Sequence, residues 1–147
     1  MTTVSQVMTR GARTLSPSDT VAQAAQLMDE LNVGVIPVCD GEKLVGMVTD
    51  RDIVVRGVAQ SLDARTAKLS EVMSGHVRCA TEDQSVEQVL GVMAEAQIRR
   101  MPVVDGKQRL VGIVTIGDIA AKVRDDDAEV AESLGDISSP AAPDRKS

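Results

Sequence analysis

Two Thr-x-x-Asp motifs are the features of this sequence best suited to binding a ligand. Thr49 and Asp52 follow the apolar run LVGMVT, and Thr115 and Asp118 follow the nearly identical run LVGIVT. A helix that begins at such a Thr presents free backbone N–H groups and a positive dipole end, which favour an anion. The carboxylate three residues on can accept two hydroxyl hydrogens, as a ribose offers. Each motif could therefore hold an anion at the helix start and a hydroxyl-bearing group at the carboxylate.

The same motif also has a purely structural interpretation. At a helix start, the Thr hydroxyl can accept a hydrogen bond from the Asp amide while the carboxylate accepts one from the Thr amide. An isolated motif favours this capping role, whereas two copies in equivalent places favour ligand binding at one of them at least. Gly46 and Gly112 are equally ambiguous, because a strand glycine marks the close approach of either a ligand or another backbone.

The two motifs belong to an internal repeat. Residues 4–56 match residues 69–122, first at an offset of 65 residues and then, after one inserted residue, at an offset of 66. The matches include the Pro-Val pairs that begin at Pro37 and Pro102. A duplication with a single inserted residue over this length predicts two copies of one supersecondary unit.

Each repeat is predicted to run strand, helix, strand, strand, helix. Short leading strands are expected at residues 13–15 and 77–80. Capping boxes at Thr20 and Ser85 begin the first helices, and Asp-Gly turns join the hairpins 35–39/44–49 and 101–104/110–115. Second helices begin at about Asp50 and Ile116. Helical spacing assigns two buried faces, namely Val21, Ala24, Ala25 and Met28 in the first repeat and Val86, Val89, Leu90 and Met93 in the second.

The expected organisation is one globular assembly built from both repeats. Three short strands and two helices leave a sheet face and an edge open, which is unfavourable in water. We therefore expect an α/β (α+β) fold in which the repeats pack with pseudo-twofold symmetry. The predicted divisions are residues 4–60, a linker at 61–68, residues 69–124, and an acidic, disordered tail at 125–147.

Composition narrows the functional classes. The 147-residue chain has a net charge of −6 and no Phe, Trp or Tyr, which argues against a nucleic-acid binder. No apolar run is long enough to span a membrane and no signal peptide is evident, so a cytoplasmic location is expected. Cys39, Cys79 and the single histidine, His76, show no metal-ligand spacing. The sequence contains no nucleophile–base motif of the kind that would indicate an enzyme.

The repeat as a whole resembles the CBS domain pair, also called the Bateman module. The resemblance is carried by Ile36-Pro37-Val38 and Met101-Pro102-Val103, by the Asp-Gly turns, and by the doubled ending G-x-V-T-x-x-D. It implies tandem CBS repeats with two clefts between them, in which many members bind AMP, ATP or S-adenosylmethionine. In the family the Asp holds the ribose hydroxyls, and the Thr or the helix start holds phosphate. With no enzyme or transporter attached, the chain resembles the stand-alone bacterial type.

Carried over by resemblance, the clefts would join residues of both repeats. One would set Thr49 and Asp52 against Arg78, Ile98, Arg99 and Arg100; the other would set Thr115 and Asp118 against Arg13, Thr14, Gly34 and Val35. The first alone would gain adjacent arginines, so we expect it to prefer a charged nucleotide, weakly held. Asp50 would repel a phosphate there unless its side chain points outward.

The predicted function is therefore a non-catalytic, ligand-sensing CBS-pair protein that binds an adenine nucleotide (AMP, ADP or ATP) or S-adenosylmethionine. The alternative is a homodimeric interaction or structural protein whose clefts do not bind nucleotide. The resemblance also implies a homodimer and a protein effector of unknown identity. No cofactor, metal, nucleic acid or membrane is expected to take part.

Overall fold

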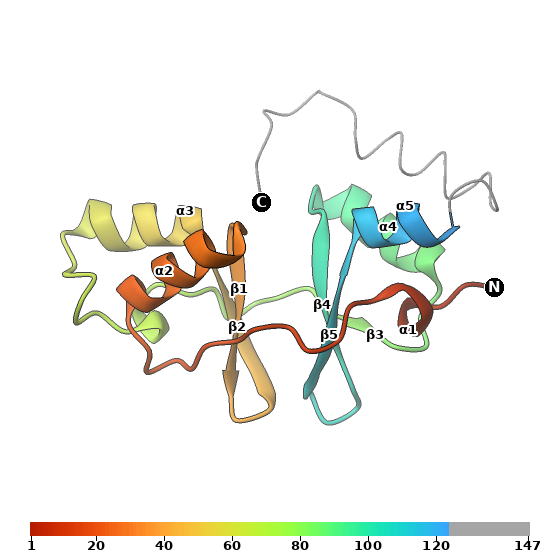
Figure 1. Cartoon of the computed structure of the whole chain (residues 1–147), viewed down its shortest axis with the longest axis horizontal. Helices are drawn as coiled ribbons and strands as arrows, with labels where there is room; N and C mark the ends of the chain where they lie inside the picture. Colours follow the sequence, from red (N-terminus) through yellow and green to blue (C-terminus); the bar gives the residue numbers. More distant parts are fainter. Residues whose placement is uncertain (124–147) are drawn as a thin grey trace. The chain divides into compact units, whose positions relative to one another are not determined.

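The computed structural model describes residues 1–123, so the predicted acidic tail lies outside the described residues. The chain divides into two compact units, and each has its own arrangement of helices and strands. Among the described residues, Arg13–Val77 form the continuous unit, while Met1–Ala12 and residues 78–123 form the split unit. Figure 1 shows the red N-terminal segment, with α1, in the same unit as α4 and α5.

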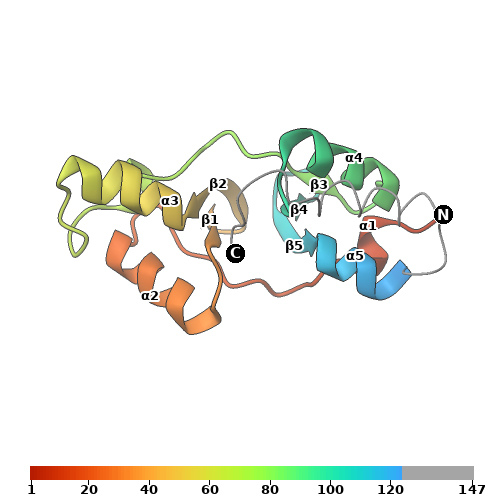
Figure 2. The same ribbon diagram turned by 90° about the horizontal axis from the view of Figure 1, so that it is seen from above.

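The continuous unit contains α2 (Val21–Leu31), the hairpin of β1 (Val35–Asp40) and β2 (Lys43–Thr49), and a helical run from residue 50 to residue 60. This run consists of α3 (Asp50–Asp52), the π-helical η1 (Ile53–Gly57) and the 3₁₀-helical η2 (Val58–Gln60). A further 3₁₀ turn, η3 (Leu69–Glu71), follows. Figure 2 shows α2 and the 50–60 run side by side.

The split unit contains α1 (Val4–Val7), β3 (Ala80–Thr81), α4 (Val86–Ala96), β4 (Arg100–Val104), β5 (Leu110–Thr115) and α5 (Ile116–Val123). Its sheet has the order β3-β4-β5, with β3 parallel and β5 antiparallel to β4. The predicted capping boxes are present: the hydroxyls of Thr20 and Ser85 accept from the amides three residues on. The prediction of a mixed helix-and-strand fold with two related repeats is confirmed.

Each unit takes a short leading helix from the other repeat. Val4 and Val7 of α1 are buried in the hydrophobic cluster of the split unit. Sixty-five positions later, Leu69 of η3 and the adjacent Val72 are buried in the cluster of the continuous unit. The buried residues form two clusters, one per unit, and the packing of the two repeats into one assembly stays a prediction. Burial of these aliphatic side chains supplies apolar surface that neither repeat provides by itself.

Backbone contacts explain the strand glycines. A Cβ atom added at Gly46 would lie 2.6 Å from the carbonyl oxygen of Ser74. Ser74 also exchanges two backbone hydrogen bonds with Met47, of 2.9 and 3.0 Å. The arrangement recurs at Gly112, where the carbonyl oxygen of Thr9 would be 2.8 Å from such an atom. Of the two explanations that the sequence left open, the close approach of another backbone is the one observed.

The leading strands are shorter than predicted. Of residues 77–80, only Ala80 belongs to β3, and in the segment 13–15 only Leu15 forms a bridge, with Val38. Leu15 donates to the carbonyl of Pro37 and accepts from the amide of Cys39. Extending this parallel ladder backward would require an N–H from Pro37, which proline lacks. The second repeat has a proline, Pro102, at the equivalent place.

The first-helix faces were predicted with one error. Val86, Val89, Leu90 and Met93 are all buried on α4, as predicted, and so are Val21, Ala24 and Met28 on α2. Ala25, however, is exposed, and Leu27 is buried in its place. The helix presents its larger apolar side chain to the core because burying Leu removes more apolar area from water than burying Ala.

Asp105 organises the turn between β4 and β5. Its carboxylate accepts hydrogen bonds from the backbone N–H groups of Arg109 and Lys107, each at 2.9 Å, and from Nε of Arg109 at 2.7 Å. The backbone hydrogen bond from Arg109 is the largest cause that lowers the pKa of Asp105, desolvation opposes it as the next largest, and the Arg109 side chain and the Lys107 amide lower the pKa further. Donors to the ionised form stabilise it.

Candidate functional site

Both Thr-x-x-Asp motifs form reciprocal caps at a helix start. The hydroxyl of Thr49 accepts from the Asp52 amide at 2.9 Å, and Oδ2 of Asp52 accepts from the Thr49 amide at 3.0 Å. At the second motif the corresponding distances are 3.0 Å, from the Asp118 amide to Oγ1 of Thr115, and 3.1 Å, from the Thr115 amide to Oδ2 of Asp118. The capping interpretation is therefore correct, and the structure holds each Thr and Asp side chain in a defined orientation.

Each carboxylate nevertheless keeps one oxygen that the cap does not use. Oδ1 of Asp52 lies 4.0 Å from Nε of Arg56, which is too long for a hydrogen bond. Within residues 1–123, Oδ1 of Asp118 has no hydrogen-bond donor. The Asp52 side chain is 16% exposed, so it is screened from bulk water but accessible. A carboxylate in this setting can accept a hydrogen bond from a ligand hydroxyl without giving up the cap.

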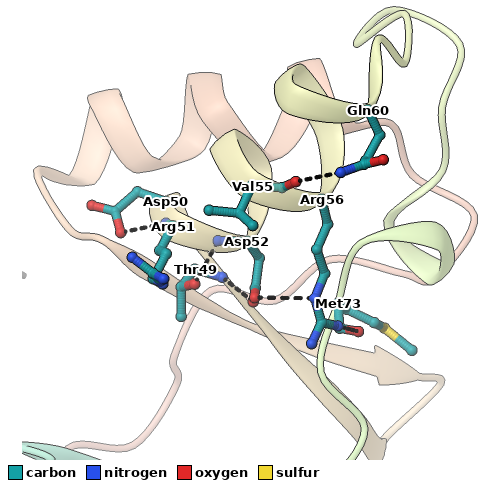
Figure 3. Close-up of polar contacts among 8 residues, drawn as sticks. All are labelled: Thr49, Asp50, Arg51, Asp52, Val55, Arg56, Gln60 and Met73. Atoms are coloured by element: carbon teal, nitrogen blue, oxygen red, sulfur yellow. Dashed lines mark hydrogen bonds and ion pairs between the residues drawn. The ribbon is translucent and has the colours of Figure 1, made fainter.

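The side chain of Asp50 points outward, away from the position beside Thr49 where its charge would repel an anion. Its side chain is exposed, and its Oδ1 accepts from the backbone N–H of Arg51 at 2.8 Å (Figure 3). The outward orientation that the sequence required for anion binding beside Thr49 is therefore present.

The residues before each Pro-Val pair lie at the helix start of their own unit. Gly34 accepts the backbone hydrogen bond of Asp50, and Val35 is the antiparallel partner of Thr49. In the same way, the carbonyl of Arg99 accepts from the amide of Ile116, and Arg100 is the partner of Thr115. Directly opposed residues share a face of the sheet. A cation thus stands beside the Thr115 cap and an aliphatic side chain beside the Thr49 cap.

The predicted clefts set these pre-proline residues against the cap of the other unit. That grouping joins residues of the continuous and split units and stays a prediction. Within the units, Arg13 forms an exposed ion pair with Glu30 at 3.2 Å, and Arg78 forms the equivalent pair with Glu95 at 3.4 Å. A phosphate would have to compete with these carboxylates for the two arginines.

Two further predicted site residues differ in burial. Thr14 is exposed, whereas Ile98 is partly buried and packs against the core of the split unit. Ile98 therefore has a packing role that does not depend on a ligand.

The cysteines show no metal or redox arrangement in the described part of the chain. Cys39 is buried and Cys79 half-buried, and burial raises the pKa of each thiol. Over residues 1–123 no three His, Cys, Asp or Glu side chains lie close enough together to hold a metal ion. In the same range no helix is long and apolar enough to cross a membrane.

Sequence reasoning missed Arg56. Its guanidinium donates through Nη1 to the carbonyl oxygen of Met73 at 3.2 Å and faces Asp52 from one turn further along the helical run (Figure 3). The i, i+4 spacing of Asp52 and Arg56 is a recognised signal for a side-chain pair on a helix. The contact with Met73, by contrast, has no local signal in the sequence.

With this geometry in place, comparisons with known proteins identify the family. A model of the CBS domain matches residues 4–57 and 69–125. The CBS domain-containing protein YhcV of Bacillus subtilis is 46% identical over 120 residues, which make up 82% of this chain and 84% of that protein.

Two solved structures are similar over most of their length. The CBS domain pair of protein MJ0100, in complex with methylthioadenosine and S-adenosylmethionine, is 32% identical with a TM-score of 0.71, covering 82% of this chain and 94% of that chain. CBSX2 in complex with AMP is 26% identical with a TM-score of 0.72, covering 82% and 95%. This chain belongs to the CBS domain family and carries two copies of the domain.

Proposed function

We propose that this protein is a non-catalytic sensor that binds an adenine nucleotide or S-adenosylmethionine at its Thr-Asp caps. The observation that carries the proposal is that the two oxygens of each carboxylate have different partners. Oδ2 of Asp52 and of Asp118 caps the helix, while Oδ1 remains available to a ribose hydroxyl. Because the cap holds the carboxylate in place before any ligand arrives, little side-chain entropy is lost on binding.

The ligand class is supported by the relatives. Two solved CBS proteins that cover more than four-fifths of this chain hold AMP in one case and S-adenosylmethionine with methylthioadenosine in the other. The remaining predicted contacts, including Arg78, Arg99 and Arg100 around one cap and Arg13 around the other, would supply the cations for phosphate. A sensor without catalysis acts through a partner, so the proposal includes a protein effector and a cytoplasmic setting.

The first experiment is a titration with AMP, ADP, ATP and S-adenosylmethionine. The melting temperature, followed by far-UV circular dichroism, should rise with a true ligand. A ligand at about a hundred times its Kd adds about 2.7 kcal/mol to the free energy of unfolding. The chain contains no Phe, Trp or Tyr, so an adenine nucleotide retained through purification would dominate the ultraviolet spectrum. No shift with any of the four compounds at millimolar concentration would overturn the proposal.

The second experiment separates binding from capping. Asp52→Asn and Asp118→Asn keep an oxygen for the Thr amide but replace the other carboxylate oxygen by a donor. Each should weaken its ligand about ten- to a hundredfold at nearly unchanged melting temperature, because a charged hydrogen bond is worth about 1.5–3 kcal/mol. Gln88→Ala is the matched control: it breaks an equivalent capping box at Ser85, so it should lower stability and leave affinity unchanged.

A separate observation favours self-association. Val54, Val55 and Val58 are exposed by 56%, 42% and 66%, and their spacing places them on one side of the helical run. Leu31 of α2 is also exposed, whereas the other large apolar side chains in the described range are buried or partly buried, apart from Met1 at the chain end. Exposed apolar groups gathered on one element are typical of protein interaction sites. We infer that this valine face is the homodimer contact.

Light scattering after size-exclusion chromatography tests this inference. Val54→Glu combined with Val58→Glu should convert a dimer into monomers, because two carboxylates would be buried without partners. Gln26→Glu, at an exposed position of α2, is the control for added charge. A monomeric wild-type protein, or a double variant that stays dimeric, would exclude the valine face as the contact.

A further inference from the structure

Arg56 makes the Asp52 cap chemically different from the Asp118 cap. Its Nη1 is held by the carbonyl oxygen of Met73 at 3.2 Å, while its Nε lies 4.0 Å from Oδ1 of Asp52 (Figure 3). Met73 is itself fixed, because its neighbour Ser74 is paired with β2 through two backbone hydrogen bonds. The Met73 carbonyl thus holds the guanidinium through Nη1, and Nε faces the oxygen of Asp52 that the cap does not use.

The second repeat has no such arrangement. Lys122 is the residue four positions after Asp118, it is exposed, and over residues 1–123 it forms no ion pair. The helices differ as well: α5 is a regular α-helix, whereas Arg56 lies in the π-helical η1. π-helical turns are rare and often mark functional sites. The π-helical turn and the arginine held by Met73 therefore both lie beside the Asp52 cap.

The gap between Arg56 and Asp52 fits one hydroxyl group. Two atoms 4.0 Å apart can each lie about 2.8 Å from a single oxygen between them. A hydroxyl in that place donates its hydrogen to Oδ1 of Asp52 and accepts the N–H of Arg56, so both charged partners are satisfied. An ether, a methylene or a hydrogen atom cannot serve both groups. Oδ1 of Asp118 offers only the acceptor half of this arrangement.

We propose that Arg56 is a specificity-determining residue that, together with Asp52, binds one ribose hydroxyl and makes this cap selective for ribonucleotides over their deoxy analogues. The inference rests on the proposed function, because it concerns the sugar of the same nucleotide. It goes further in assigning the selectivity to one arginine and to one of the two caps. The Asp118 cap binds the ribose with less discrimination.

Single-site proteins allow the two caps to be compared. Asp118→Asn leaves the Asp52 cap intact, and Asp52→Asn leaves the other. Calorimetric titration with AMP, 2′-deoxy-AMP and 3′-deoxy-AMP gives, for each protein, the ratio of the weaker deoxy Kd to the AMP Kd. We expect this ratio to be about tenfold larger at the Asp52 cap, since one additional charged hydrogen bond is lost there.

Arg56→Gln in the Asp118→Asn protein should reduce the ratio to that of the Asp118 cap. Arg56→Lys keeps a cation that can still reach the Met73 carbonyl, so this variant is the test if Arg56→Gln is unstable. Arg56→Lys should also lose the selectivity, because an ammonium lacks the directed Nε–H of a guanidinium. Lys122→Gln in the Asp52→Asn protein is the matched control, and its ratio should not change.

The outcomes distinguish this inference from the proposal beneath it. Failure of the wild-type protein to bind AMP overturns both. If AMP binds but Arg56→Gln and Arg56→Lys leave the ratio unchanged, or weaken AMP and its deoxy analogues equally, only the inference fails. A loss seen for AMP relative to adenosine, with an unchanged deoxy ratio, would assign Arg56 to the phosphate and would also overturn the inference.

Discussion

Replacing Gly46 by alanine tests whether the 72–74 segment is held tightly against β2. The new Cβ would lie 2.6 Å from the backbone carbonyl oxygen of Ser74, and ordinary contacts begin at 3.4 Å. The segment must therefore give way by about 0.8 Å, the difference between these two distances. A flexible side chain could move aside, but here the nearest atom belongs to a backbone that is hydrogen-bonded to Met47.

The magnitude follows from two alternative responses. If the segment stays in place, overpacking costs about 1–3 kcal/mol. If it moves away, the clash is relieved but the two backbone hydrogen bonds weaken, at about 0.5–1.5 kcal/mol each. Alanine recovers about 0.5–1 kcal/mol of backbone entropy in either case. We expect Gly46→Ala to destabilise the protein by about 1–2 kcal/mol, or roughly 5–15 °C in Tm for a unit of this size.

Far-UV circular dichroism in urea and on heating provides the measurement, since the chain has no aromatic fluorophore. Gly91→Ala is a matched control with the opposite sign: a Cβ there meets nothing within 4 Å, so alanine in the middle of α4 should stabilise by about 0.5–1 kcal/mol. If Gly46→Ala were as stable as the wild type, or shifted in the same direction as Gly91→Ala, the close approach of Ser74 to β2 would be refuted.

Three further predictions concern charged and ionisable groups. Asp105 has a depressed folded-state pKa, so it contributes stability above its unfolded pKa of about 3.9 and loses it as the pH falls through the folded value; Asp105→Asn should flatten this acid limb in urea titrations. The raised pKa values of Cys39 and Cys79 predict a loss of stability as the pH rises above about 8.5, because unfolded thiols ionise first; replacing both by alanine should remove that pH dependence. Glu95→Gln should cost less than about 1 kcal/mol in urea, since the pair with Arg78 is more than half exposed, and a larger loss would indicate a structural role for the pair.

Local patterns predicted the elements that surround the caps. The hairpin expected at residues 35–39 and 44–49 is observed as Val35–Asp40 and Lys43–Thr49, because alternating apolar residues and the Asp-Gly turn specify pairing over short distances. The capping role of Thr49 and Asp52 was likewise one of two interpretations open from the sequence, and the hydrogen bonds confirm it.

Contacts between distant segments were not predictable in the same way. The short leading helices have the apolar residues needed for burial, but nothing local states which repeat will bury them. Arg56 reaches Met73, seventeen positions away, from a π-helical turn that residue propensities do not predict. For Arg100, the antiparallel register sets it opposite Thr115, whereas the resemblance had grouped it with Thr49. Any grouping of residues across the two units stays a prediction.

The division of the chain into a continuous and a split unit has a consequence for synthesis on the ribosome. Arg13–Val77 are consecutive, so that unit has all its residues as soon as residue 77 has left the exit tunnel. The split unit needs Met1–Ala12 and residues 78–123, so its first residues emerge long before the residues they pack against. During this interval Val4 and Val7 are exposed, and closing the connection across the finished unit is the step of highest contact order. We therefore expect ribosome-bound chains stalled shortly after residue 77 leaves the tunnel to contain one protease-resistant unit and an N-terminal arm that is still cleavable.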